Sequence, residues 1–208
     1  PGRGLTQLNE PPGMPGRFTF YGRRRQTSEG HEQTWALNHL APFALSLSLY
    51  ELLARSGGRI VNLCTRFYGS GRIDFDDIES TKRYRPLSAY ANAKLANLIF
   101  TRELQRRCGP SGVRVNAVQP GDVYTNAAQN SGWLLRAAYR VLGPLLFLSP
   151  ERGADSVVWA ATAVDVPGGQ LIYRRQVREV TAACTDPELA RRLWELTEQQ
   201  TGLRRDSF

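Results

Sequence analysis

Tyr90-Ala91-Asn92-Ala93-Lys94 is the stretch on which the interpretation of this chain depends. It lies in an Ala- and Leu-rich run, residues 87–107, which predicts a helix. A tyrosine and a lysine four residues apart lie one turn apart on the same helix face. An ammonium beside a phenol favours phenolate and lowers the pKa of a tyrosine from its usual value of about 10. Such a phenol can exchange a proton with an alcohol or a carbonyl.

The same spacing also occurs by chance in many helices, where a packed ring lies beside a solvated amine. The motif alone therefore does not decide between a catalytic pair and ordinary packing, and its flanks must do so.

The flanks predict strands that alternate with helices, which implies a parallel sheet with right-handed crossovers. In open parallel sheets the site lies beyond the carboxyl ends of the strands. Thr65, the start of the Tyr90 helix and Pro120-Gly121 all fall at that edge. The predicted strands are 59–64, 113–118 and 170–173. The first predicted helix runs from a cap at Thr27 or Ser28 to Gly57-Gly58, with a kink at Pro42. The other predicted helices run from Pro86 to about Cys108, over 150–163, and from Asp186-Pro187 onward.

The composition is that of one globular domain of 208 residues with a formal net charge of +8. This charge suits anionic partners, namely phosphorylated cofactors, anionic membrane surfaces or nucleic acid. The arginines are scattered, and no zinc spacing or RNA-binding signature accompanies them, so we expect no nucleic-acid partner.

The cysteines are three, an odd number, and lie far apart at Cys64, Cys108 and Cys184. They form neither a metal-binding pattern nor a disulfide framework, which fits a reducing compartment. No apolar run is long enough to span a bilayer, and no signal peptide opens the chain. We expect a cytoplasmic protein, with association to a membrane surface as an open alternative.

Four motifs follow one another in a recognisable order: Asn38-His39-Leu40-Ala41-Pro42-Phe43, Gly58-Arg59-Ile60-Val61-Asn62, Tyr90-Ala91-Asn92-Ala93-Lys94-Leu95-Ala96-Asn97 and Pro120-Gly121-Asp122-Val123-Tyr124-Thr125. With this order and spacing, from about Thr27 to Leu203, the chain resembles the short-chain dehydrogenase/reductase family, in its retinol dehydrogenase-like branch. The resemblance implies an α/β fold, a Rossmann-like parallel sheet with flanking helices.

The resemblance implies that Tyr90 is the general acid/base and that Lys94 lowers its pKa and binds the nicotinamide ribose. Asn38 would hold a water in the proton relay. The family's catalytic serine falls on Thr65, which keeps a hydroxyl but adds a methyl that stiffens the side chain and crowds the pocket. Cys64, just before it, is better interpreted as a small buried filler than as a nucleophile.

The implied cofactor is NADP(H) or NAD(H). Tyr90 and Lys94 would contact it, together with Pro120, Gly121, Val123 and Thr125, which match the segment beside the nicotinamide and the diphosphate. Residues 126–149 correspond to the substrate-binding loop. Its leucines and Trp133 fit a lipophilic substrate or a membrane surface, and equally fit ordinary packing of a lid.

The family begins with a strand, a glycine-rich turn and a helix whose N-terminus holds the cofactor diphosphate. Gly2-Arg3-Gly4 is not followed by such a helix. We therefore expect an N-terminally incomplete fold, with an irregular segment over 1–26 and the C-terminal part of the Rossmann domain over 27–208. An unpaired strand edge would then invite pairing with another chain, including a homo-oligomer.

Two functions compete at this point. The first is an oxidoreductase that moves hydride between NAD(P)(H) and a lipophilic, retinol-like alcohol or carbonyl. The second is a non-catalytic, truncated homologue that acts as a binding protein or pseudoenzyme, which the replacement at Thr65 and the missing phosphate-binding turn favour.

Overall fold

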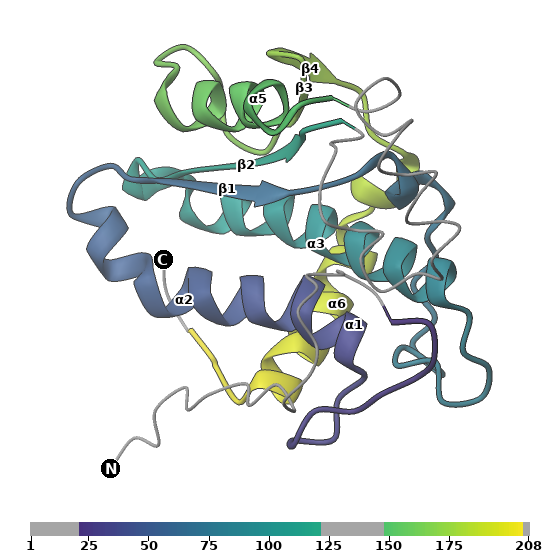
Figure 1. Cartoon of the computed structure of the whole chain (residues 1–208). Helices are drawn as coiled ribbons and strands as arrows, with labels where there is room; N and C mark the ends of the chain where they lie inside the picture. The colour runs from purple at the N-terminus through teal and green to yellow at the C-terminus, as the bar shows by residue number, and fades with distance from the viewer. Residues whose placement is uncertain (1–20, 122–147, 206–208) are drawn as a thin grey trace.

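The computed structural model describes residues 21–121 and 148–205, which form one sheet between two layers of helices (Figure 1). Neighbouring strands follow the order β1-β2-β3-β4. The first three strands are parallel, as predicted, and β4 is antiparallel to β3. The strands are β1 (Arg59–Leu63), β2 (Arg114–Gln119), β3 (Leu171–Tyr173) and β4 (Gln176–Arg178).

The helices cover both faces of the sheet. Helix α5 packs on one face, and α3 packs on the other, with α2 and α6 behind it (Figure 1). The α-helices are α1 (Gln33–Trp35), α2 (Ala41–Ala54), α3 (Pro86–Cys108), α5 (Pro150–Thr162) and α6 (Pro187–Thr201). A π-helical segment, η1 (Ala36–Leu40), joins α1 to α2, and the 3-10 helices are η2 (Arg66–Ser70), η3 (Gly109–Ser111) and η5 (Ala182–Cys184).

The start of the first helix was predicted wrongly. Thr27 closes a turn, in which Gly30 N donates to Thr27 O at 3.1 Å, and the helix begins only at Gln33. Its N-cap is Glu32, whose carboxylate accepts from the backbone N–H groups of Thr34 and Trp35 at 2.8 and 2.7 Å. A capping glutamate satisfies the free backbone N–H groups of the first turn as a capping serine or threonine does. The helix therefore begins after Glu32, nearer to the apolar run than the sequence predicted.

The helix is distorted just before Pro42, where we expected a kink. Over η1 the backbone hydrogen bonds span five residues instead of four, and the Ala41 N–H donates to Ala36 O. A proline has no N–H, and its ring clashes with the carbonyl four residues earlier, which here belongs to Asn38. A π segment relieves that clash, and such segments are frequent at functional sites.

Strand β4 was missed because its turn lacks the usual residues. Two-residue hairpin turns need positive φ at both central positions and favour Asn-Gly or Asp-Gly. Here the two positions are Arg174 and Arg175, with φ of 51° and 59°. A side chain in this left-handed region costs about 1–2 kcal/mol per residue relative to right-handed helix.

Strand β1 forms one end of the strand order, and within the described residues it pairs only with β2. Beside it lies a groove of about 430 Å³ between β1 and α2, lined partly by Leu45, Leu49 and Ile60. Leu45 is 56% exposed although it belongs to an apolar helix face. The open strand edge expected from the sequence is therefore present in this part of the chain, with an apolar groove beside it.

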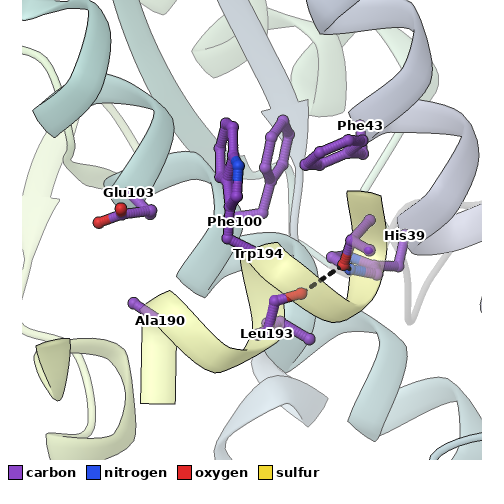
Figure 2. Close-up of a pocket in the computed structure, with 8 residues that line it drawn as sticks. His39, Phe43, Phe100, Glu103, Ala190, Leu193 and Trp194 are labelled. Atoms are coloured by element: carbon purple, nitrogen blue, oxygen red, sulfur yellow. Dashed lines mark hydrogen bonds between the residues drawn. The ribbon is translucent and has the colours of Figure 1, made fainter. Parts of the chain in front are cut away.

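An aromatic cluster joins α2, α3 and α6 on the face of the sheet that α3 covers (Figure 2). His39 lies at its border, fully buried, and its Nε2 lies 2.9 Å from Thr197 Oγ1. Because Thr197 donates its own hydroxyl proton to Leu193 O at 2.7 Å, it must accept from His39. His39 is therefore the neutral tautomer with the proton on Nε2, and its Nδ1 is buried without a partner among the described residues.

Burial lowers the pKa of His39 from 6.5 to about 3. Between these values the unfolded chain binds a proton that the folded chain does not, so we expect stability to fall as the pH drops below about 6.5. Urea unfolding of the wild type and of His39→Leu at a series of pH values measures this contribution. The variant should lose less stability on acidification, and an identical pH dependence in the two proteins would contradict the assignment.

Candidate active site

The candidate site forms where α3 passes under the carboxyl end of β1. Lys94 Nζ donates to the backbone carbonyl of Leu63, the last residue of β1, at 2.9 Å. The same ammonium lies 5.8 Å from the ring centroid of Tyr90, which is half-buried one turn earlier on α3. The structure therefore brings the predicted pair together with the end of a parallel strand.

The electrostatic surroundings of Lys94 are unusual for a lysine. Its side chain is only 8% exposed, and burial lowers its pKa below the usual 10.5. Among the described residues it forms no ion pair, and the Leu63 carbonyl is its hydrogen-bond acceptor. Because the charge is little screened at such a depth, it acts strongly on polar groups that lie beside it.

Replacing Lys94 by Met is expected to remove a pH dependence of stability. Since burial lowers the folded-state pKa of Lys94, the unfolded chain binds more protons between that value and 10.5, and stability rises with pH across this window. The Met variant should show a flatter profile and equal or higher stability at neutral pH. Denaturant unfolding from neutral to alkaline pH measures both, and a marked loss of stability at neutral pH would contradict this account.

Asn38 lies in the π segment η1, which packs against α3. It is buried, and its Nδ2 donates to Thr34 O at 2.9 Å. Its side chain is thus held by the backbone of the preceding turn. The distorted segment places Asn38 on the α3 side of the site, and its role in a relay stays a prediction.

Thr65 follows β1 by two residues in extended conformation, with φ −148° and ψ 156°. It occupies the N-cap position of η2, yet its side chain makes no capping hydrogen bond. Within the described residues its hydroxyl has no hydrogen-bond partner, which leaves it available to a substrate oxygen. Cys64 is buried, and burial raises the pKa of its thiol to about 12, so it is an unreactive filler as expected.

Pro120 and Gly121 follow directly after β2 at the same edge. Gly121 has φ 93°, and a Cβ at this position would lie 2.8 Å from Leu148 Cδ1, so only glycine fits here. Val123, Thr125, Trp133 and most of the predicted substrate loop, 126–149, lie outside the described residues.

Sequence reasoning missed a polar hub that holds the loop between η2 and α3. The Glu79 carboxylate accepts hydrogen bonds from His31 Nδ1, from the Glu32 backbone N–H and from Gln200 Nε2, each at 2.8 Å. These contacts tie the loop to the start of the first helix and to the end of α6. Its partners are 47 to 121 positions away in sequence, so no local pattern could have indicated them.

The described residues fit one end of a nicotinamide cofactor. Lys94 and Tyr90 could hold a ribose, and Pro120-Gly121 lies at the same edge, directly after β2. A glycine-rich turn that could hold a diphosphate at a helix N-terminus does not occur within 21–121 or 148–205.

The comparisons with known proteins agree on one family. The family model described as short chain dehydrogenase matches residues 21–133, more than half of the chain. Polyprenol dehydrogenase of Mus musculus is 37% identical over 180 residues, covering 82% of this chain and 54% of that protein. Retinol dehydrogenase 14 of Homo sapiens is 33% identical over 183 residues, covering 86% and 54%. The chain thus spans about half the length of these relatives.

Solved structures give the same result. An uncharacterized protein from Mycobacterium Paratuberculosis superposes with a TM-score of 0.69 at 31% identity, over 88% of this chain and 63% of that one. A short-chain dehydrogenase/reductase of unknown function from Caenorhabditis Elegans, solved with cofactor, superposes with a TM-score of 0.52 at 25% identity, over 68% and 52%. The Rossmann-like fold predicted from the sequence is therefore confirmed.

Proposed function

Because this chain belongs to the short-chain dehydrogenase family, we propose that it serves the transfer of hydride between NAD(P)(H) and a lipophilic, retinol-like alcohol or carbonyl. The observation that carries the proposal is the buried Lys94 ammonium, fixed to Leu63 O beside the Tyr90 ring. A buried cation next to a phenol, at the carboxyl edge of a parallel sheet, is an arrangement suited to acid/base chemistry.

In the direction of reduction, the Tyr90 hydroxyl donates its proton to the carbonyl oxygen of the substrate. The Lys94 ammonium stabilises the resulting phenolate, which can then be reprotonated through the relay in which the family resemblance places Asn38. The Thr65 hydroxyl donates a hydrogen bond to the same substrate oxygen and orients it. When bound, the nicotinamide of NADP(H) or NAD(H) would supply the hydride. Lys94 would hold its ribose, and Pro120, Gly121, Val123 and Thr125 are the residues that the family resemblance assigns to its binding.

The relatives and the sequence support a lipophilic substrate. The names of the relatives refer to retinol and polyprenol, both lipophilic alcohols. The segment 126–149 is rich in leucine and carries Trp133, which suits such a substrate. Contact with a membrane surface, from which such a substrate could be drawn, belongs to this proposal. None of the helices in the described part of the chain combines the length and hydropathy that a membrane crossing needs.

A second candidate is a binding protein without catalysis. Threonine in place of the family serine favours it, and so does the open β1 edge, which could pair with another chain or a second copy. Titration of NADPH against the chain, followed by fluorescence, separates the two candidates. Saturable binding in the micromolar range that weakens in Lys94→Met supports the enzyme, whereas no binding at millimolar NADPH supports the binding protein.

Substitutions at Thr65 test whether its hydroxyl takes part. We expect Thr65→Ala to lower the rate of carbonyl reduction on the order of 10- to 100-fold, because a donor to the developing oxyanion is lost. Thr65→Ser keeps the donor and removes the methyl group that crowds the pocket, so its rate should equal or exceed that of the wild type. Steady-state consumption of reduced cofactor measures both, and equal rates for Ala and Ser would remove Thr65 from the mechanism.

A further inference from the structure

The β3–β4 hairpin carries an unusual concentration of positive charge. Its turn consists of Arg174 and Arg175, both exposed and both in the left-handed region, and Arg178 follows three residues after Arg175, at the end of β4. Arg175 is neutralised by a bidentate pair with Asp155 of α5, with one nitrogen–oxygen distance of 2.8 Å. The other two arginines have no carboxylate partner among the described residues.

Arg174 and Arg178 converge on one aromatic ring. Their guanidinium carbons lie 5.1 and 5.6 Å from the ring centroid of Tyr173. Two like charges that share one ring repel each other, and the ring quadrupole compensates them only in part. An anion that binds at these guanidinium groups would offset this concentration of positive charge, and a phosphate offers the oxygen geometry that guanidinium groups bind best.

The position of the hairpin links it to the candidate site. Tyr173 pairs in register with Gln119, the residue before Pro120-Gly121. A Cβ on Gly121 would lie 3.8 Å from the Tyr173 ring and 2.8 Å from Leu148. The ring that carries the two arginines therefore lies close to Gly121 and Leu148, at the carboxyl edge of the sheet.

We propose that Arg174 and Arg178, on the ring of Tyr173, bind the phosphate of an anionic lipid headgroup and so seat the carboxyl edge of the sheet on a membrane surface. The inference rests on the proposed function, which requires access to a lipophilic substrate. Arginine beside apolar and aromatic residues is the combination that binds anionic membrane interfaces.

Sedimentation with lipid vesicles tests the proposal without any enzyme assay. The full chain is mixed with vesicles of phosphatidylcholine alone or with added phosphatidylglycerol. We expect binding to the anionic vesicles only, and the double variant Arg174→Asn, Arg178→Gln should weaken it roughly 10-fold or more. Asparagine suits the positive φ at position 174, so the turn should be retained. The control variant Arg55→Gln, Arg83→Gln removes the same charge from exposed arginines elsewhere and should bind nearly as the wild type does.

Equal weakening by the two double variants would overturn the proposal, since it would show a general effect of net charge. Wild-type binding in the hairpin variant would overturn it as well. Inorganic phosphate at millimolar concentration should not displace the chain from vesicles at constant ionic strength; displacement would mean that the site serves free phosphate. Reduction of a short, soluble aldehyde, or NADPH titration if no turnover is seen, reports separately on the proposed function. The hairpin variant should leave both readouts unchanged.

Discussion

Tyr90→Phe is expected to lower the rate of carbonyl reduction by roughly 10²- to 10⁴-fold, the range that a positioned general acid contributes. The substitution removes one hydroxyl and keeps the half-buried ring, so the contact with the Phe67 ring, centroids 6.5 Å apart, should persist. The loss should therefore appear in kcat while NADPH binding changes little. The measurement is oxidation of the reduced cofactor with retinal-like and short aldehydes.

Tyr68→Phe is the matched control for this prediction. Tyr68 lies in η2, close in sequence to Thr65, and within the described residues its hydroxyl makes no hydrogen bond. Its variant should keep the wild-type rate and fold. Equal rates for Tyr90→Phe and the wild type would remove Tyr90 from the chemistry and leave only the family relationship.

Trp194→Ala should cost about 3–5 kcal/mol of unfolding free energy, the largest effect on stability that we expect from a single substitution. Trp194 is 3% exposed, and its ring centroid lies 5.0 Å from that of Phe43 and 5.9 Å from that of Phe100 (Figure 2). Its Nε1 donates to Glu198, and the Arg107 guanidinium carbon lies 4.1 Å from its ring centroid. Truncation removes the side chain by which α6 docks on α2 and α3.

The effect should reach the site through the end of α6. Gln200 belongs to that helix and donates to Glu79, which holds the loop leading into α3. We therefore expect Trp194→Ala to lower both the urea midpoint and the activity, and Trp194→Phe, which keeps an aromatic ring, to lower the midpoint much less. A change below about 1 kcal/mol in the Ala variant would show that the cluster does not support α6.

The elements with strong local signals could be predicted from the sequence. Helix α3 begins at Pro86, because proline at the first helical position needs no N–H partner. Helix α6 begins after Asp186, whose carboxylate accepts from the Glu188 and Leu189 backbone N–H groups. Prediction failed where an uncommon residue took the place of the usual cap or turn residue. The first helix starts later than predicted because its cap is Glu32, and β4 was not predicted because its turn consists of two arginines.

The candidate site was predictable only in part, for a similar reason. The four-residue spacing placed Tyr90 and Lys94 on one helix face, and the alternation of strands and helices placed them at the carboxyl edge of the sheet. The acceptor of the Lys94 ammonium, Leu63 O, is a backbone atom 31 positions away, and any residue type supplies such a carbonyl. The Glu79 hub likewise depends on long-range packing.

The bond between Lys94 and the last carbonyl of β1 has a mechanical consequence. A strand held along one side has larger fluctuations than a strand held along both, and β1 is bonded only to β2 among the described residues. The Lys94 ammonium moves with that strand end, so its distance from the Tyr90 ring varies with it. Pairing the free edge of β1 with another strand should therefore raise the turnover rate before it raises the melting temperature measurably. The turnover rate would then report more sensitively than the melting temperature on whether that edge is paired.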